Sequence, residues 1–164
     1  MRRSLAGAAV AALLFAAPAA AALPRPGMLV PGRSLGGIRL GEPAAAVTSA
    51  LGTFHGICRG CATTTWYFTY KPFHRQGLAV ELTRGRVSAV YTLWQPLAWH
   101  AAKGLQLGAY EAQVTQVAGT LPIFSCPGYT VLVLDTRLSR TAYYIDDGRL
   151  WGFGLLQRGE DPCR

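Results

Sequence analysis

Two cysteines three residues apart carry the most reactive chemistry in this chain of 164 residues. Cys58 and Cys61 form a C-x-x-C motif, with Arg59 as a cation between them. As thiols they could act as a redox pair, because a neighbouring cation favours the thiolate. Redox pairs of this type usually lie at a helix N-terminus in a βαβ unit, whereas this pair precedes a predicted antiparallel strand. The pattern favours a structural disulfide, with thiol–disulfide exchange as the alternative.

The same loop contains residues that could bind a metal ion. His55, Cys58 and Cys61 follow one another at intervals of three, and His74 comes later. Imidazole and thiolate ligands suit zinc or copper. In an exported protein, however, an oxidising compartment converts such thiols to a disulfide. We therefore predict no metal and no cofactor, and we interpret His55, His74 and His100 as surface or loop residues.

The four cysteines of the chain predict two disulfides. Three pairings exist, and we favour Cys58–Cys61 together with Cys126–Cys163. The second bond would close a loop of roughly 37 residues and hold the C-terminal segment. A bond between Cys58 and Cys126 remains open, because these two residues occupy matching places in the internal repeat described below.

No catalytic motif accompanies these residues. The sequence contains no nucleophile elbow, phosphate-binding loop or H-E-x-x-H motif. Asp146 and Asp147 are adjacent carboxylates, but Asp147-Gly148 is a strong two-residue hairpin turn signal. The sequence therefore predicts a protein that is not an enzyme.

The N-terminal residues indicate export. Arg2 and Arg3 precede an apolar run from Leu5 to Ala17, and four alanines follow at 19–22. This order is typical of a cleaved signal peptide over residues 1–22. The apolar run is shorter than the about 20 residues that a membrane span needs. We predict a secreted or extracytoplasmic protein without a membrane span.

The distribution of charge argues against a nucleic-acid partner. The formal net charge is +8, and removing Arg2 and Arg3 lowers it to +6. The remaining basic residues are scattered along the chain. Proteins that bind nucleic acid usually gather their basic residues on one face or segment. We therefore predict an exported protein or a cell-wall component as the partner.

The mature sequence contains an internal repeat. Residues 37–41 (GIRLG) correspond to residues 104–108 (GLQLG), and residues 79–87 correspond to residues 142–150. Such self-similarity defines the domain organisation. The predicted parts are the signal peptide (1–22), an extended Pro/Gly arm (23–33), repeat 1 (34–94), a linker (95–103) and repeat 2 (104–164).

Each repeat predicts one short helix and about three antiparallel strands. A Pro start and a Gly stop favour a helix over Pro43–Leu51, and Gly119 ends its counterpart over Tyr110–Ala118. Alternating residues predict strands at 64–70, 77–83, 86–94, 129–135, 140–146 and 149–156. Units this small bury too little core alone. We therefore predict an α+β fold in which both repeats share one continuous sheet, with the helices on one side.

The hairpin register of repeat 1 predicts which side chains face outward. A two-residue turn at Arg84-Gly85 places Leu82 opposite Val87 and Val80 opposite Ala89, facing the core. Glu81 and Ser88 then face the solvent, as expected for a sheet with one exposed face.

The same register transferred to repeat 2 predicts an aromatic face. Tyr143 would lie opposite Gly152 in the core, and Tyr144, Trp151 and Phe153 would point outward. Exposed apolar patches mark interaction sites, and Tyr and Trp are favoured interface anchors. We predict Tyr144, Trp151 and Phe153 as binding residues, the alternative being that the arm or the linker covers them.

The Gly-[Ile/Leu]-x-Leu-Gly segment, followed by a Val-containing helix that ends in Gly and by an antiparallel sheet, resembles the β-lactamase inhibitor protein-like fold. The small outer-membrane assembly lipoproteins of the SmpA/OmlA type contain a similar unit. The tandem halves, export and four cysteines are most similar to the secreted inhibitor protein. The C-x-x-C spacing is tighter than in that family, and the lipobox of the lipoproteins is absent.

The resemblance implies a concave, aromatic-rich sheet that grips a protruding element of a partner protein. Tyr144, Trp151 and Phe153 would fit that role. We therefore expect an exported, non-catalytic binding module that acts through protein–protein recognition, including inhibition. The alternative is an extracytoplasmic thiol–disulfide or metal-binding protein that uses the Cys58/Cys61 loop.

Overall fold

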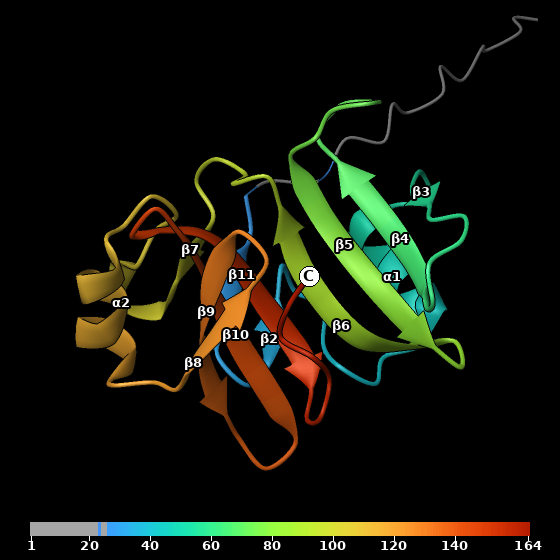
Figure 1. The fold of residues 1–164 in the computed structure, drawn as a ribbon. Helices are drawn as coiled ribbons and strands as arrows, with labels where there is room; N and C mark the ends of the chain where they lie inside the picture. Colours follow the sequence, from blue (N-terminus) through green and yellow to red (C-terminus); the bar gives the residue numbers. More distant parts are fainter. Residues whose placement is uncertain (1–22, 24–25) are drawn as a thin grey trace, which may run out of the picture.

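The computed structural model describes Leu23 and residues 26–164 (Figure 1). The predicted signal peptide lies outside the described residues. The helices are α1 (Ala44–Leu51) and α2 (Glu111–Ala118), with a 3-10 turn η1 (Ala102–Gly104), and the strands are β1 (Met28–Val30), β2 (Ser34–Leu35), β3 (Gly56–Ile57), β4 (Thr64–Thr69), β5 (Gly77–Thr83), β6 (Arg86–Leu93), β7 (His100–Ala101), β8 (Ile123–Cys126), β9 (Tyr129–Asp135), β10 (Ser139–Asp146) and β11 (Arg149–Gln157). Neither described helix is long and apolar enough to cross a membrane.

One antiparallel sheet of eight strands runs through the molecule, in the order β3-β4-β5-β6-β11-β10-β9-β8. The N-terminal strands, drawn green, form one half of this sheet, and the C-terminal strands, drawn orange and red, form the other (Figure 1). The halves meet at β6 and β11 through three residue pairs, from Tyr91–Gly154 to Ala89–Leu156. The predicted α+β class and the large antiparallel sheet are confirmed.

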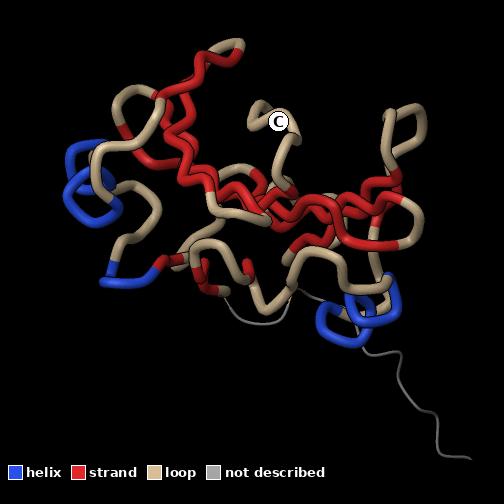
Figure 2. Tube along the Cα trace, turned by 90° about the horizontal axis from the view of Figure 1, so that it is seen from below, coloured by secondary structure: helices blue, strands red, loops and turns tan. Residues whose placement is uncertain are grey.

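Both helices lie on one side of the sheet, and the C-terminal segment lies on the other, concave side (Figure 2). The helices bury Val47, Leu51 and Val114 against the helix side, which carries the larger core. A smaller buried cluster on the concave side consists of Ala89, Val131, Val133, Ala142, Tyr144 and Leu156. Apolar side chains therefore stabilise both faces of the sheet.

The segment before each helix attaches to the adjacent half-sheet through the same contacts. The Gly41 N–H donates to the Val87 carbonyl at 2.8 Å, and the Gly108 N–H donates to the Leu150 carbonyl at 2.6 Å. Both glycines have positive φ, 79° and 91°, a conformation that costs other residues about 1 kcal/mol or more. This geometry explains why both GxxLG segments end in glycine.

The predicted arm and linker are parts of a second, small sheet. Strand β1, inside the predicted arm, pairs with β2 and also with β7, which lies inside the predicted linker. Leu29 and Trp99 are both buried by this arrangement. The Trp99 ring packs so closely on Gly27 and Gly36 that a Cβ at either glycine would lie 2.8–2.9 Å from it. Strands of two or three residues have no detectable hydrophobic period, so the sequence did not reveal them.

A β-bulge changes the predicted register of the first hairpin. Leu82 pairs with Val87 as predicted, but the register shifts between Glu81 and Leu82. Glu81 therefore pairs with Ala89 instead of Ser88. A bulge adds one residue to one strand, so every pair beyond it moves by one position.

An equivalent bulge in the second hairpin overturns part of the predicted aromatic face. The register shifts between Tyr144 and Ile145, so Tyr144 pairs with Gly152 and Tyr143 pairs with Phe153. Phe153 is consequently buried on the helix side, where its ring lies 6.1 Å from that of Tyr143. The prediction that Phe153 faces outward is wrong, because one extra residue moves a side chain to the opposite face.

Tyr143 should make stability sensitive to alkaline pH. Burial raises the pKa of its phenol from 10.0 to about 12. In the unfolded chain the phenol ionises near 10, so the stability that the neutral form provides is complete below pH 10. That stability is lost as pH rises through about 12. We expect Tyr143→Phe to reduce the loss between pH 10 and 12 in denaturant titrations.

Candidate functional site

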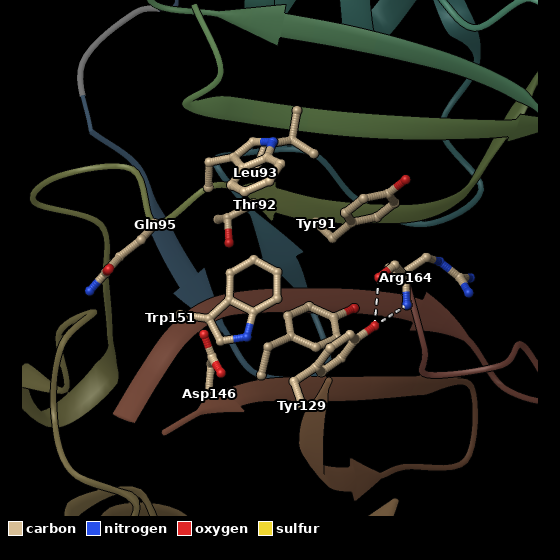
Figure 3. A pocket seen from close by; sticks show the side chains of 10 residues that line it. Tyr91, Thr92, Leu93, Gln95, Tyr129, Asp146, Trp151 and Arg164 are labelled. Carbon is tan, nitrogen blue, oxygen red and sulfur yellow. Dashed lines mark hydrogen bonds between the residues drawn. The ribbon is translucent and has the colours of Figure 1, made fainter. Parts of the chain in front are cut away.

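A cleft opens on the concave side where β6 and β11 diverge. Backbone pairing between the two strands ends at Tyr91–Gly154. At the next position the Thr92 hydroxyl bonds to the Phe153 backbone instead, accepting from its N–H at 2.9 Å and donating to its carbonyl at 3.4 Å. Beyond this side-chain link the strands enclose a hollow of about 520 Å³ (Figure 3).

The walls of the cleft are mainly aromatic. The lining residues are Tyr91, Thr92, Leu93, Trp94, Gln95, Tyr129, Tyr144, Asp146, Trp151 and Arg164. Tyr129, Tyr144 and Trp151 form a mutually packed trio with ring centroids 5.6–6.0 Å apart. Edge-on and tilted packing of this kind fixes the rings beyond what area burial alone provides. The cleft is therefore held in shape by side chains from three neighbouring strands.

The predicted binding residues occupy three different environments. Trp151 is half-buried and lines the cleft. Tyr144 also lines the cleft but forms its floor and is only 1% exposed, so its predicted exposure is wrong. Phe153 lies on the opposite face of the sheet, in the core, and has no part in the cleft. The structure adds Tyr91, Trp94 and Tyr129, which the sequence did not indicate.

Two glycines give the Tyr144 ring its place on the floor. A Cβ at Gly152 would lie 3.1 Å from the Tyr144 ring, and a Cβ at Gly154 would lie 2.5 Å from its hydroxyl oxygen. Burial raises the pKa of the Tyr144 phenol, which therefore stays neutral. Within the described residues, neither the Tyr144 hydroxyl nor the Trp151 Nε1 has a hydrogen-bond partner. The floor of the cleft thus presents apolar surface, and the two unsatisfied polar atoms are buried beneath it.

The C-terminal segment forms one wall of the cleft. Tyr129 Oη accepts a hydrogen bond from the Arg164 N–H at 2.6 Å and donates one to the Arg164 carbonyl (Figure 3). The Arg164 guanidinium pairs with Glu81 at 3.2 Å and with Glu160 at 3.6 Å. Glu81, predicted to face the solvent, is only 8% exposed as a result. This segment covers part of the aromatic face, whereas the alternative prediction gave that role to the arm or the linker.

Both favoured disulfides are confirmed: Cys58 bonds to Cys61, and Cys126 bonds to Cys163. Cys58 and Cys61 lie in the connection between β3 and β4, and no helix begins there. While they are bonded to each other, neither offers a thiolate to a metal ion. The alternative pairing of Cys58 with Cys126 is not formed.

The His55 ring belongs to an aromatic cluster. It stacks on Trp66 with ring centroids 4.1 Å apart and lies 5.2 Å from the ring of Phe68. Burial lowers the pKa of His55, which favours the neutral imidazole. Across the part of the chain that the structure describes, no three His, Cys, Asp or Glu side chains converge to hold a metal ion. The four-ligand site drawn from His55, Cys58, Cys61 and His74 is therefore not assembled.

Several solved structures share the fold. A DUF4309 family protein from Bacillus subtilis is 13% identical with a TM-score of 0.56, over 76% of this chain and 84% of that one. An extracellular protein containing an SCP domain from Bacillus anthracis is 9% identical with a TM-score of 0.55, over 73% of this chain. A cysteine-rich secretory protein from Staphylococcus aureus is 13% identical with a TM-score of 0.51, again over 73% of this chain.

The likeness is one of fold. The chain spans only 44% of the length of the Bacillus anthracis and Staphylococcus aureus proteins. No protein-family model matches the sequence, and no curated protein matches it. None of the three similar structures is described as a β-lactamase inhibitor, so that resemblance stays a prediction.

Proposed function

We propose that this protein is an exported, non-catalytic binding module that recognises another protein through the aromatic cleft. The observation that carries the proposal is the hollow of about 520 Å³ on the concave face, bounded by Tyr91, Trp94, Tyr129 and Trp151. Exposed apolar patches mark interaction sites, and Tyr and Trp are favoured anchors of protein interfaces. The partner would insert a protruding element, as the predicted inhibitor-like resemblance implies.

The cleft has the properties of an interface centre. Trp94 is 61% exposed, and aromatic side chains of this kind contribute most of the binding free energy in protein interfaces. The unpartnered Trp151 Nε1 and Tyr144 hydroxyl cost free energy in the unbound protein. Both atoms are buried, so a partner could bond to them only after the rings had moved. Tyr144 and Trp151 stand on the paired strands β10 and β11, so these two side chains need little ordering when a partner binds.

Export is supported by the covalent structure. The chain contains two disulfides, Cys58–Cys61 and Cys126–Cys163. Disulfides form and persist mainly in oxidising compartments. Residues 1–22 carry the predicted signal peptide. We further propose that the two half-sheets arose by tandem duplication, which the matching contacts of Gly41 with Val87 and of Gly108 with Leu150 support.

Crosslinking capture tests the binding role. The mature chain, Trp151→Ser and Phe73→Ser are used as baits in native envelope and culture fluid. Phe73 is a fully exposed aromatic outside the cleft, so its variant is the matched control. We expect the wild type and Phe73→Ser to capture the same protein, and Trp151→Ser to lose at least about ten-fold of it. Equal capture by Trp151→Ser would contradict the proposal. Tyr144→Ser is a poor bait, because Tyr144 is buried and its loss would disturb the fold.

A further inference from the structure

We infer that the partner protein inserts a basic side chain, arginine or lysine, into the cleft, where Asp146 is its counter-ion and Trp151 its aromatic wall. This inference rests on the proposed function and names the chemistry of the element that is recognised. It follows from the charges that face the cleft and from the rings around them. Asp146 lies beside Trp151 in the cleft (Figure 3).

Asp146 has no ion-pair partner among the described residues, although its cross-strand neighbour is a cation. Asp146 pairs in register with Arg149 at the end of the second hairpin. The Arg149 guanidinium is committed elsewhere: it donates to the Gly108 carbonyl at 3.1 Å and to the Tyr110 hydroxyl at 2.8 Å, and it stacks on the Tyr110 ring. In the described chain, no ion pair forms at Asp146. Its negative charge is therefore available to a ligand.

The other charged group that lines the cleft is already balanced. Arg164 pairs with both Glu81 and Glu160, so it adds no free positive charge. Among the residues that line the cleft, the uncompensated charge is thus that of Asp146, although Arg75 lies over the wall residue Trp94 and the chain as a whole carries +8. Complementary charge selects partners and penalises like charge. A cationic group fits this cleft better than an anionic one.

The rings of the cleft favour a cation as well. The faces of Trp and Tyr attract ammonium and guanidinium groups. Cation–π contacts of this kind also occur within the protein. Arg75 lies 5.4 Å from the Trp94 ring centroid, and Arg140 lies 5.3 Å from that of Phe124. None of the described arginines or lysines lies over the Trp151 ring. That ring is free to contact a cation that reaches Asp146.

Short peptides test this chemistry directly. The probes are acetyl-Gly-Arg-Gly-amide, its lysine counterpart, and its citrulline counterpart, which keeps the shape of arginine without the charge. Binding to the isotope-labelled mature protein is followed through the Trp151 indole N–H resonance at low ionic strength. Asp146→Asn removes the proposed counter-ion. Asp147→Asn makes the same charge change one residue later, in a turn at φ 47° that asparagine tolerates, and outside the cleft.

We expect the basic peptides to shift the Trp151 resonance and the citrulline peptide to bind at least about five-fold more weakly. Asp146→Asn should lose a similar factor, and Asp147→Asn should bind like the wild type. Equal binding of the arginine and citrulline peptides, equal binding by Asp146→Asn, or no shift with either basic peptide would overturn the inference. If Trp151→Ser still loses the captured partner in those cases, the proposed function stands without it. If capture is also independent of Trp151, both fail.

Discussion

Phe153→Ala is expected to lower the free energy of unfolding by about 3–5 kcal/mol, the usual cost of emptying a fully buried phenylalanine site. The ring is completely inaccessible and packs against Tyr143 in the helix-side core. Its removal loses the transfer free energy of the ring and leaves a cavity that a paired strand cannot close. Urea denaturation followed by circular dichroism measures the change.

The same experiment tests the bulge in the second hairpin. Without the register shift between Tyr144 and Ile145, Phe153 would face the cleft, and its truncation would cost binding but little stability. Phe73→Ala is the matched control, since a fully exposed phenylalanine should change stability by less than about 0.5 kcal/mol. A loss at Phe153 as small as that at Phe73 would contradict the register described here.

Removing the Cys126–Cys163 disulfide is expected to cost about 4 kcal/mol, and removing Cys58–Cys61 only about 1.5–2 kcal/mol. The difference comes from the loops that the bonds close, with sequence separations of 37 and 3, because a longer loop removes more entropy from the unfolded chain. Paired Cys→Ser variants at each bond, compared by denaturant unfolding, measure both values. Equal losses would show that native-state effects outweigh loop closure.

The longer disulfide should also control the shape of the cleft. Cys163 holds Arg164 against Tyr129 and Glu81. Without the bond, the segment that forms one wall is free to leave, and Glu81 loses its counter-ion. We expect the Cys126→Ser/Cys163→Ser variant to show changed Trp151 and Tyr129 resonances even where it remains folded. The Cys58→Ser/Cys61→Ser variant should leave these resonances unchanged.

Local signals account for the parts of the fold that the sequence predicted well. Pro43 precedes α1, and Gly52 and Gly119 end the two helices with φ of 90° and 86°, so the helix bounds were right to within one residue. The turns at Arg84-Gly85 and Asp147-Gly148 both have positive φ at each residue, as hairpin turns require. Each of these features depends on residues that are close together in the chain.

The cleft depends on features that such signals do not contain. The alternation of residues along β11 shows no sign of the bulge, yet the extra residue in this strand moves Phe153 to the face opposite to that of Trp151. Tyr91 lines the same cleft as Trp151 only because the two halves pair at β6 and β11. One signal was available: the glycines at 152 and 154 alternate in a strand, which often marks a close approach by another group.

The narrow contact between β6 and β11 has a consequence for how the molecule folds. The hairpins on either side join neighbouring segments, but the Thr92–Phe153 link joins residues 61 positions apart. Non-local pairing costs loop-closure entropy before the new contacts add stability. Contacts of this kind therefore form late and slow the folding of the chain. We expect each half to acquire its hairpins first and the junction to close afterwards. The cleft, built across that junction, would then come into existence only in the final step of folding.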